Sequence, residues 1–156
     1  MIYITGDITV DSFVEFAKQM SKNANNTVQI SLISSGGDAQ AALAYYDLIK
    51  AHGSCYIVAT GYVASAAVLI LAAGKKRYMT KNAWVMVHEE SVTELAGDVR
   101  AIEREARQLR RYEDQWARIL ASVTNASAEQ WTELHKAETF MMAEQCLAYG
   151  LIEEII

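Results

Sequence analysis

Short apolar runs separated by longer segments of helical character constrain the fold of this chain more than any other feature. We predict strands at Ile2–Thr5, Val28–Ile33, Cys55–Thr60, Trp84–His88 and, at the end of the chain, Leu151–Ile156. Between the first four we predict helices at Asp11–Asn23, Asp38–Ala51 and Ser65–Ala73. Parallel strands need a crossover connection that is usually helical, so this alternation predicts an α/β fold with a mostly parallel sheet.

The second half of the chain begins with a longer helix, predicted over Asp98–Val123. Its apolar residues recur at helical spacing on one side, and arginines follow the other side from Arg100 to Arg111. A helix of that length extends about 39 Å, so we expect part of it to project from the body. The arginines are explained by exposure to water, by contact with another subunit, or by a binding patch.

Local signals mark further helix ends. The pairs Ser12 with Glu15 and Ser127 with Gln130 have the spacing of capping boxes, in which each side chain bonds to the backbone N–H of the other residue. Gly150 is predicted to end a helix, because glycine readily adopts the left-handed conformation found there.

Composition limits the classes of function. Hydrophobic residues make up 52% of the 156 residues, enough for one sizeable core, so we predict a single domain over residues 1–156. A net charge of −5 gives no reason to expect a nucleic-acid partner. The three histidines lack the spacing of metal ligands, so neither a metal nor another cofactor is expected. Cys55 and Cys146 lie among apolar residues and are predicted to be buried thiols.

We also expect a cytoplasmic protein with no membrane segment. The N-terminal sequence MIYITGDITV has no basic leader followed by an apolar run. The longest apolar stretch, Val63–Ala73, is interrupted by Ser65 and is too short for a membrane-spanning helix, which needs about 20 residues.

The segment GYVASAAVLILAAG, residues 61–74, contains one hydroxyl, that of Ser65, among small and apolar side chains. Ser65 lies where a predicted strand and a glycine turn meet a buried helix, so its hydroxyl would cap that helix or act as a nucleophile. A serine nucleophile needs a base, an acid that orients the base, and N–H donors for the oxyanion. The backbone N–H of Ala66 is one such donor.

Two other places in the chain could supply the remaining groups. Gly37, in the segment SSGGDAQAA, offers a second N–H with no side chain in the way, although a glycine pair also serves as a plain helix-entry turn. His88 ends the predicted strand WVMVH, where it would either face a cleft as a base or have a structural role. The residues alone leave these alternatives open.

Taken together, these segments resemble the Clp protease proteolytic subunit. GYVASAAVLILAAGKKRYMTKNAWVMVHEE resembles that family's segment from the nucleophile to the histidine. SSGGDAQAALAYYDLIK resembles its glycine-pair segment, and FMMAEQCLAYGLIEEII resembles its C-terminal segment. The blocks keep the order and spacing of the family across nearly the whole chain.

The resemblance implies a ClpP/crotonase-type α/β fold, a spiral of βα units with a projecting handle helix at about 98–123. It also implies a serine-type endopeptidase, a hydrolase in which Ser65 attacks the peptide carbonyl, His88 is the base and Glu138 is the acid of the triad. The N–H groups of Gly37 and Ala66 would bind the oxyanion, and water would then hydrolyse the acyl-enzyme.

The family assembles heptameric rings, usually stacked in pairs as tetradecamers with the active sites inside. The resemblance therefore implies a cytoplasmic homo-oligomer that carries out proteolysis of unfolded polypeptides in a chamber. An ATP-driven AAA+ unfoldase normally feeds that chamber, and paralogous ClpP subunits are further candidate partners.

The sequence departs from the family pattern around the acid. Glu138 stands where the family has an aspartate, and Ala137 stands where an arginine usually helps the rings to dock. A glutamate can orient a histidine if its additional methylene is accommodated. Glu89 and Glu90 are alternative acids next to His88 in the sequence.

Further departures concern partners. We expect a short, divergent member that lacks the N-terminal axial-loop segment. Gln29 and Ser31, with Ala51 nearby, match positions where aromatic residues usually receive the unfoldase, and Ser35 replaces a proline before the glycine pair. Two alternatives to an active peptidase follow: a catalytically weak or regulatory subunit of a mixed ring, or a crotonase-fold acyl-CoA enzyme, which uses two N–H donors without this Ser–His pair.

Overall fold

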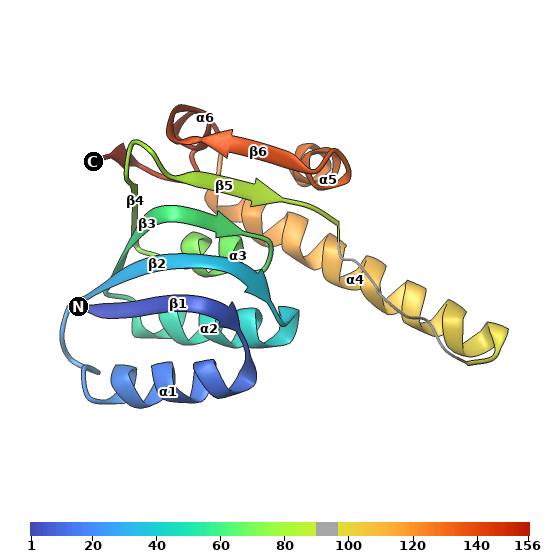
Figure 1. The fold of residues 1–156 in the computed structure, drawn as a ribbon, viewed down its shortest axis with the longest axis horizontal. Coiled ribbons are helices and arrows are strands. Elements are labelled where there is room, and N and C mark those ends of the chain that lie inside the picture. The colour runs from blue at the N-terminus through green and yellow to red at the C-terminus, as the bar shows by residue number, and fades with distance from the viewer. Residues whose placement is uncertain (90–96) are drawn as a thin grey trace.

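The computed structural model describes residues 1–89 and 97–156. Within them a seven-stranded sheet is formed by β1 (Ile2–Ile8), β2 (Val28–Gly37), β3 (Cys55–Ala64), β4 (Lys76–Met79), β5 (Trp84–Val87), β6 (Thr139–Met142) and β7 (Glu154–Ile155). The helices are α1 (Val10–Ser21), α2 (Ala39–His52), α3 (Ala67–Ala72), α4 (Val99–Val123), α5 (Ala128–Lys136) and α6 (Ala143–Ala148). Figure 1 shows α1, α2 and α3 along one face of the sheet and α4 extending away from the body.

Strand β3 is the branch point of the sheet. The order β1-β2-β3-β4-β7 is parallel, and β5 joins β3 off this path. The first half of β3, from Tyr56 to Ala59, pairs with β4, whereas its second half, from Tyr62 to Ala64, pairs with β5. β6 joins β5 in the antiparallel sense. The predicted α/β fold with a mostly parallel sheet is therefore confirmed.

The predicted strands are all present, but several have different ends. β1, β2 and β3 run further than predicted, and β2 includes the glycine pair, so Gly37 ends a strand and Asp38 caps the following helix. β7 is shorter than the predicted Leu151–Ile156. β4 is missed by the sequence analysis, because its buried positions are Arg77 and Met79 and a charged residue breaks the apolar pattern of the strand.

Helix α3 forms the centre of the hydrophobic core. Every residue from Ala67 to Ala72 is buried, and the helix contacts α2, α4 and three strands of the sheet. Burying apolar surface contributes about 25 cal/mol per Å², so α3 is held firmly in place. It begins two residues later than predicted. Its N-cap is Ala66, with no side-chain cap hydrogen bond, so the prediction that Ser65 caps this helix is wrong.

Helix α4 agrees closely with the prediction for Asp98–Val123. The Asp98 side chain accepts a hydrogen bond from the Ala101 N–H and caps the helix. Only Trp116, Ala117 and Leu120 are fully buried, and all three lie in the C-terminal half. The N-terminal half projects from the body, as expected (Figure 1), and Val99 is 72% exposed.

The cap predictions have mixed outcomes. The capping box of Ser127 and Gln130 is confirmed at α5. Gly150, with φ of 71°, follows the C-cap of α6, which confirms that it ends a helix. The first capping box is wrong in register, because Thr9 caps α1 and Ser12 is its partner at the third helical position.

Both thiols are buried and free, as predicted. Burial raises the pKa of Cys55 to about 11 and that of Cys146 to about 12, so neither is a reactive thiolate near neutral pH. No helix within residues 1–89 and 97–156 is long and apolar enough to span a bilayer.

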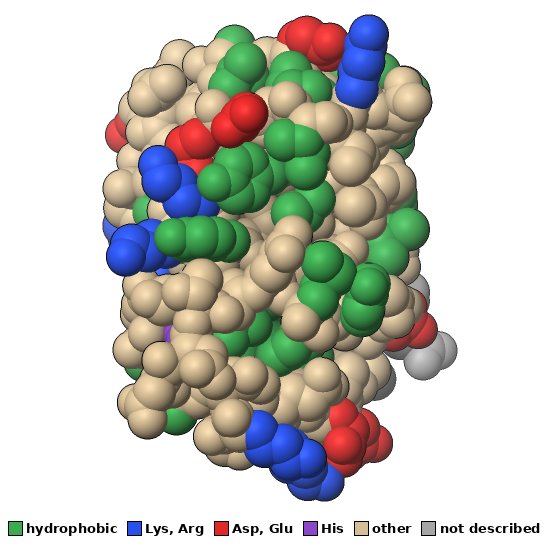
Figure 2. All heavy atoms as spheres, turned by 90° about the vertical axis from the view of Figure 1, so that its left-hand side faces the viewer, with side chains coloured by type: hydrophobic (Ala, Val, Ile, Leu, Met, Phe, Trp, Pro, Cys, Tyr) green, Lys and Arg blue, Asp and Glu red, His purple; other side chains and the backbone are tan. Residues whose placement is uncertain are grey.

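Large apolar side chains remain exposed on the surface. Trp84 of β5 and Phe140 of β6 are 44% and 54% exposed, and Tyr3 of β1 is exposed as well. On the side where both termini lie, apolar side chains form several separate clusters between polar atoms (Figure 2). Exposed apolar clusters of this kind are typical of surfaces that contact other chains.

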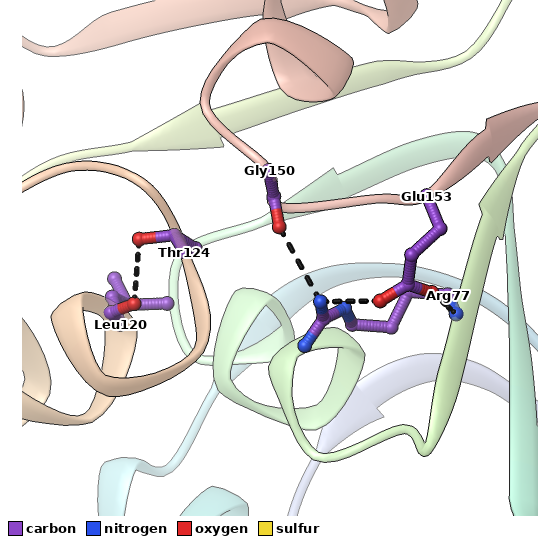
Figure 3. A network of polar contacts seen from close by, with 5 residues as sticks. All are labelled: Arg77, Leu120, Thr124, Gly150 and Glu153. Atoms are coloured by element: carbon purple, nitrogen blue, oxygen red, sulfur yellow. Dashed lines mark hydrogen bonds and ion pairs between the residues drawn. The ribbon is translucent and has the colours of Figure 1, made fainter.

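Arg77 ties β4 to the C-terminal segment (Figure 3). Its guanidinium Nη2 donates to a carboxylate oxygen of Glu153 at 2.5 Å and lies 3.4 Å from the Gly150 carbonyl oxygen. The Arg77 backbone N–H donates to the other carboxylate oxygen of Glu153. Because the Arg77 side chain is only 11% exposed, removing it leaves a carboxylate without its counter-ion in a partly dry site.

We therefore expect Arg77→Met to lower the free energy of unfolding by about 2 kcal/mol. The matched control is Lys76→Met on the same strand, where the side chain is exposed and the expected change is within about 0.5 kcal/mol. Urea denaturation of both variants measures the difference. Equal losses would contradict the proposed role of the Arg77–Glu153 pair.

Candidate active site

Pairing of β3 with β5 places Ser65 next to His88. Ala64 lies beside Met86 in the parallel register, so Ser65 falls beside Val87, one residue before His88. The Ser65 N–H donates to the Met86 carbonyl at 2.9 Å, which continues the pairing beyond the end of β3. Two residues far apart in the sequence thus meet at the carboxyl ends of neighbouring parallel strands.

Pairing of β5 with β6 brings Glu138 to the same place. Val87 lies opposite Thr139 in the antiparallel register. Continued by one residue, that register puts Glu138 opposite His88. The sheet therefore brings the backbones of the three predicted triad residues together at one edge.

Ser65 and Glu138 share an uncommon backbone conformation. They are the two non-glycine residues with positive φ within residues 1–89 and 97–156, at 54° and 48°. The left-handed conformation costs a residue with a side chain about 1–2 kcal/mol. Such strain persists where surrounding structure imposes it, and it occurs preferentially at functional sites.

The turn at Ser65 joins strand β3 directly to helix α3. The Ser65 carbonyl accepts a hydrogen bond from the Val68 N–H at 3.0 Å, which starts the first turn of the helix. The Ser65 side chain is half-buried. A sharp strand-to-helix turn with a strained serine is also how nucleophile elbows present their hydroxyl.

The glycine pair lies against this turn. A Cβ added at Gly36 would lie 2.7 Å from the Ser65 Cβ and 2.8 Å from the Ala64 carbonyl oxygen. The Gly36 φ is 101°, so both space and conformation require glycine. The buried hydroxyl of Ser34 supports this segment, because it donates to the Gly6 carbonyl and accepts from the Gly36 N–H.

The two predicted oxyanion donors, Gly37 and Ala66, directly follow Gly36 and Ser65 in the chain. Ala66 is fully buried, and no residue in the described parts of the chain accepts a hydrogen bond from its backbone N–H. Gly37 pairs with Ile8 of β1, and a Cβ there would collide with the Ile8 carbonyl oxygen. The contact with Ser65 is made by Gly36, so the role of the Gly37 N–H stays a prediction.

The strand registers place the backbones of the three triad residues together, but within the described residues their side chains are not joined by hydrogen bonds. Over residues 1–89 and 97–156, no side-chain hydrogen bond links Ser65, His88 and Glu138. His88 is half-buried, whereas Glu138 is exposed. Glu89 is exposed as well, and Glu90 lies outside the described residues. In the absence of substrate, catalytic hydrogen bonds are often long and form only in the reacting complex.

His135 is a residue near the site that sequence reasoning missed. It is 7% exposed and packs edge-on against Trp116 and Trp131. Its carbonyl accepts the Glu138 N–H at 3.1 Å, which fixes the left-handed turn at Glu138. Burial lowers the pKa of His135, and the nearby charge of His88 lowers it further. No spacing in the sequence signals this residue, because its surroundings come from the packing of α4 on α5.

Comparison with known proteins matches this arrangement to one family. The family model of Clp protease matches residues 1–156. The chain belongs to the Clp protease family. Its members include ATP-dependent Clp protease proteolytic subunit 2 of Chlamydia trachomatis, 34% identical over 142 residues that cover 88% of this chain and 68% of the relative. The same subunit of Treponema pallidum is 29% identical and covers 99% of this chain and 81% of its own length.

Solved structures agree with this assignment. A ClpP1 mutant from Listeria monocytogenes superposes with a TM-score of 0.89 at 27% identity, covering 99% of this chain and 90% of that one. The predicted ClpP-type fold with its long helix α4 is therefore confirmed. The family to which the chain belongs is one of serine peptidases.

The contact between Gly36 and Ser65 yields a stability prediction. We expect Gly36→Ala to lower the free energy of unfolding by about 3 kcal/mol, because it adds a collision with the Ser65 turn to the strain of a positive φ. Gly6→Ala is the control, since Gly6 also has a positive φ but has no atom within 4 Å of the added Cβ. Its expected loss is about 1 kcal/mol. Urea denaturation that gives equal losses would contradict the tight contact.

Proposed function

We propose that this chain is an active serine endopeptidase subunit that cleaves unfolded polypeptides inside an oligomeric chamber. The observation that carries the proposal is the convergence of Ser65, His88 and Glu138 at one sheet edge, with Ser65 and Glu138 held in left-handed conformations. If Ser65 had only a structural role, a glycine would suit this turn better, because glycine adopts a positive φ with less strain.

The proposed chemistry follows from the positions of these groups. Ser65 Oγ attacks the carbonyl carbon of the peptide bond while His88 takes the hydroxyl proton. The negative charge that develops on the carbonyl oxygen is stabilised by the Ala66 N–H, which has no acceptor in the described parts of the chain, and by the Gly37 N–H. His88 then passes its proton to the leaving amine, and water hydrolyses the acyl-enzyme.

Glu138 is proposed to orient His88 and to stabilise its protonated form. Its position opposite His88 supports this role, and its side chain is exposed to water rather than packed inside the protein. The side chain has one methylene more than an aspartate, so it reaches further from the same backbone position. We propose that assembly or substrate binding brings the carboxylate onto His88.

Self-association is the proposed setting for this chemistry. The projecting half of α4 and the exposed Trp84 and Phe140 offer surfaces that a single chain leaves open to water. Rings of seven, stacked or single, in the cytoplasm are the arrangement that the family suggests. The relatives are named as proteolytic subunits of an ATP-dependent protease, which supports an AAA+ unfoldase or a paralogous subunit as partner.

Labelling with a fluorescent phosphonate tests the nucleophile. We expect the assembled protein to be labelled at Ser65 and Ser65→Ala to show no label and no peptide cleavage, a loss of at least about 1,000-fold. Ser122→Ala is the control, because that hydroxyl is exposed on α4, away from the three triad positions, and donates to the Ile119 carbonyl of the same helix. A wild-type protein without label in assembled form would favour the alternative of a regulatory subunit.

Exchange of the acid tests the role of Glu138. We expect Glu138→Gln to lower kcat about 100-fold or more without changing oligomer size, because an amide does not stabilise the protonated histidine. Glu138→Asp keeps the charge and should retain activity within about tenfold of the parent protein. Peptide turnover and sedimentation velocity measure both effects. Unchanged turnover in Glu138→Gln would show that another group orients His88.

A further inference from the structure

The connection from α5 to β6 carries the candidate acid. α5 ends at Lys136 with Ala137 as its C-cap, and β6 begins at Thr139. Glu138 lies between the cap and the strand, with a φ of 48°. The residue after a helix C-cap often adopts this left-handed conformation, and it is then usually glycine. A glutamate in this place therefore depends on neighbouring contacts to hold the turn.

One of these contacts is made by the side chain of Thr139. The Glu138 N–H donates to the His135 carbonyl at 3.1 Å, and the adjacent Leu134 carbonyl accepts no backbone N–H from any part of the chain that the structure describes. The last carbonyls of a helix have no partner within it. Thr139 Oγ1 donates to the Leu134 carbonyl at 2.8 Å and so provides the partner that the helix lacks.

Thr139 is paired at the same time with the strand that carries the candidate base. Its backbone lies opposite Val87 in the antiparallel pairing of β5 and β6. Val87 is buried and directly precedes His88. Through its backbone Thr139 thus contacts the strand of the base, and through its hydroxyl it contacts the helix that precedes the acid. This one residue therefore fixes how far the end of α5 lies from the end of β5.

The helix end that Thr139 holds is itself well anchored. His135, the residue after Leu134, is 7% exposed and packs edge-on against Trp116 and Trp131. Its Nδ1 lies 2.6 Å from the Trp131 carbonyl oxygen, so a hydrogen bond fastens the ring within the helix. The hydroxyl of Thr139 therefore bonds to a carbonyl whose position is set by buried aromatic packing.

The Thr139 hydrogen bond is strong enough to affect the conformation of Glu138. The net contribution of one intramolecular hydrogen bond is similar in size to the strain of one left-handed residue. Without the hydroxyl, the connection loses a restraint that opposes this strain, and Glu138 can relax toward the right-handed conformation. A misplacement of about 1 Å at a reacting centre can lower a rate about 100-fold. A small shift of the carboxylate is thus sufficient to separate it from His88.

We propose that Thr139 is a positioning residue for the triad acid, and that its hydroxyl fixes the Glu138 turn so that the carboxylate stays within reach of His88. The inference rests on the proposed peptidase function, because Thr139 acts only through Glu138 and His88. Thr139 itself takes no part in proton transfer or in the attack on the peptide bond. Its effect is expected on kcat, because the carboxylate stabilises the protonated His88 that forms during the reaction and does not hold the bound peptide.

Peptide turnover by the assembled, full-length protein tests the proposal. Thr139→Val keeps the shape of the side chain and removes the hydroxyl, and we expect kcat to fall about tenfold with KM unchanged within about twofold. Thr139→Ser and Thr139→Ala form a second pair that differs only in the hydroxyl, so kcat of the serine variant should exceed that of the alanine variant by a similar factor.

Thr132→Val is the matched control. That hydroxyl also donates to a carbonyl of α5, that of Ala128 at 3.0 Å, but it is not part of the Glu138 turn. We therefore expect Thr132→Val to keep the parental kcat. Sedimentation velocity checks that each variant assembles, and the serine–alanine pair at Thr139 decides the outcome if the valine variant does not assemble.

A double-mutant cycle separates positioning from general stability. In the Glu138→Gln background, Thr139→Val should lower kcat by less than about twofold, because the carboxylate that it positions is already gone. A full tenfold loss in that background, an equal loss in Thr132→Val, or a parental kcat in Thr139→Val overturns the positioning role and leaves the peptidase function standing. Absence of both peptide cleavage and Ser65 labelling in the parent protein overturns the two proposals together.

Discussion

The rest of the structure depends on how β3 divides its hydrogen bonds. Its first half pairs with β4 and its second half with β5, while its other edge pairs with β2 along most of its length. Because β5 continues where β4 leaves off, the end of β3 lies beside the end of β5. β6 then joins β5 in the opposite direction, which brings the start of β6 to the same edge. One branched strand thus determines where Ser65, His88 and Glu138 meet.

The strained backbone conformations of Ser65 and Glu138 are maintained by buried residues packed next to them. Ser65 adopts a left-handed conformation, which is unfavourable for a residue with a side chain. It is followed closely by α3, whose residues are all buried and which therefore holds the turn in place. On the other side Gly36 approaches so closely that no side chain fits between the two segments. Glu138 is held in a similar way by the buried His135 at the end of α5. In both cases a rigid neighbour keeps a polar residue in a conformation that it would not adopt alone.

The elements that could be predicted are those in which apolar residues recur at regular spacing in the sequence. The apolar runs of β1, β2, β3 and β5 and the long helical repeat of α4 indicate their elements correctly, because one-sided burial leaves a pattern of period 2 or 3.6. β4 was missed because its buried arginine is neutralised by Glu153, which lies far along the chain. The continuation of β2 through Gly37 was missed for a related reason. A glycine pair in a sequence predicts a turn, and only the pairing of Gly36 and Gly37 with β1 shows that they belong to a strand.

The residues of the candidate site also fall into two groups, those that the sequence indicates and those that it does not. The chemistry of Ser65 and His88 could be singled out from residue type and from the strand ends on which they lie. Glu138 was found by family resemblance, and its place opposite His88 depends on the antiparallel pairing of β6. His135 could not be found at all, because its side chain is buried only after α4 packs on α5.

The sequence by itself determined the alternation of elements, the buried character of α3 and the identity of the groups that can react, because these follow from local composition and spacing. The tertiary structure decided that Ser65 lies in a strained turn and does not cap a helix, that Gly36 is the glycine packed against it, and that His135 is buried against Trp116 and Trp131. Those features depend on contacts between segments far apart in the chain, and such contacts leave no local signal in the residues that make them.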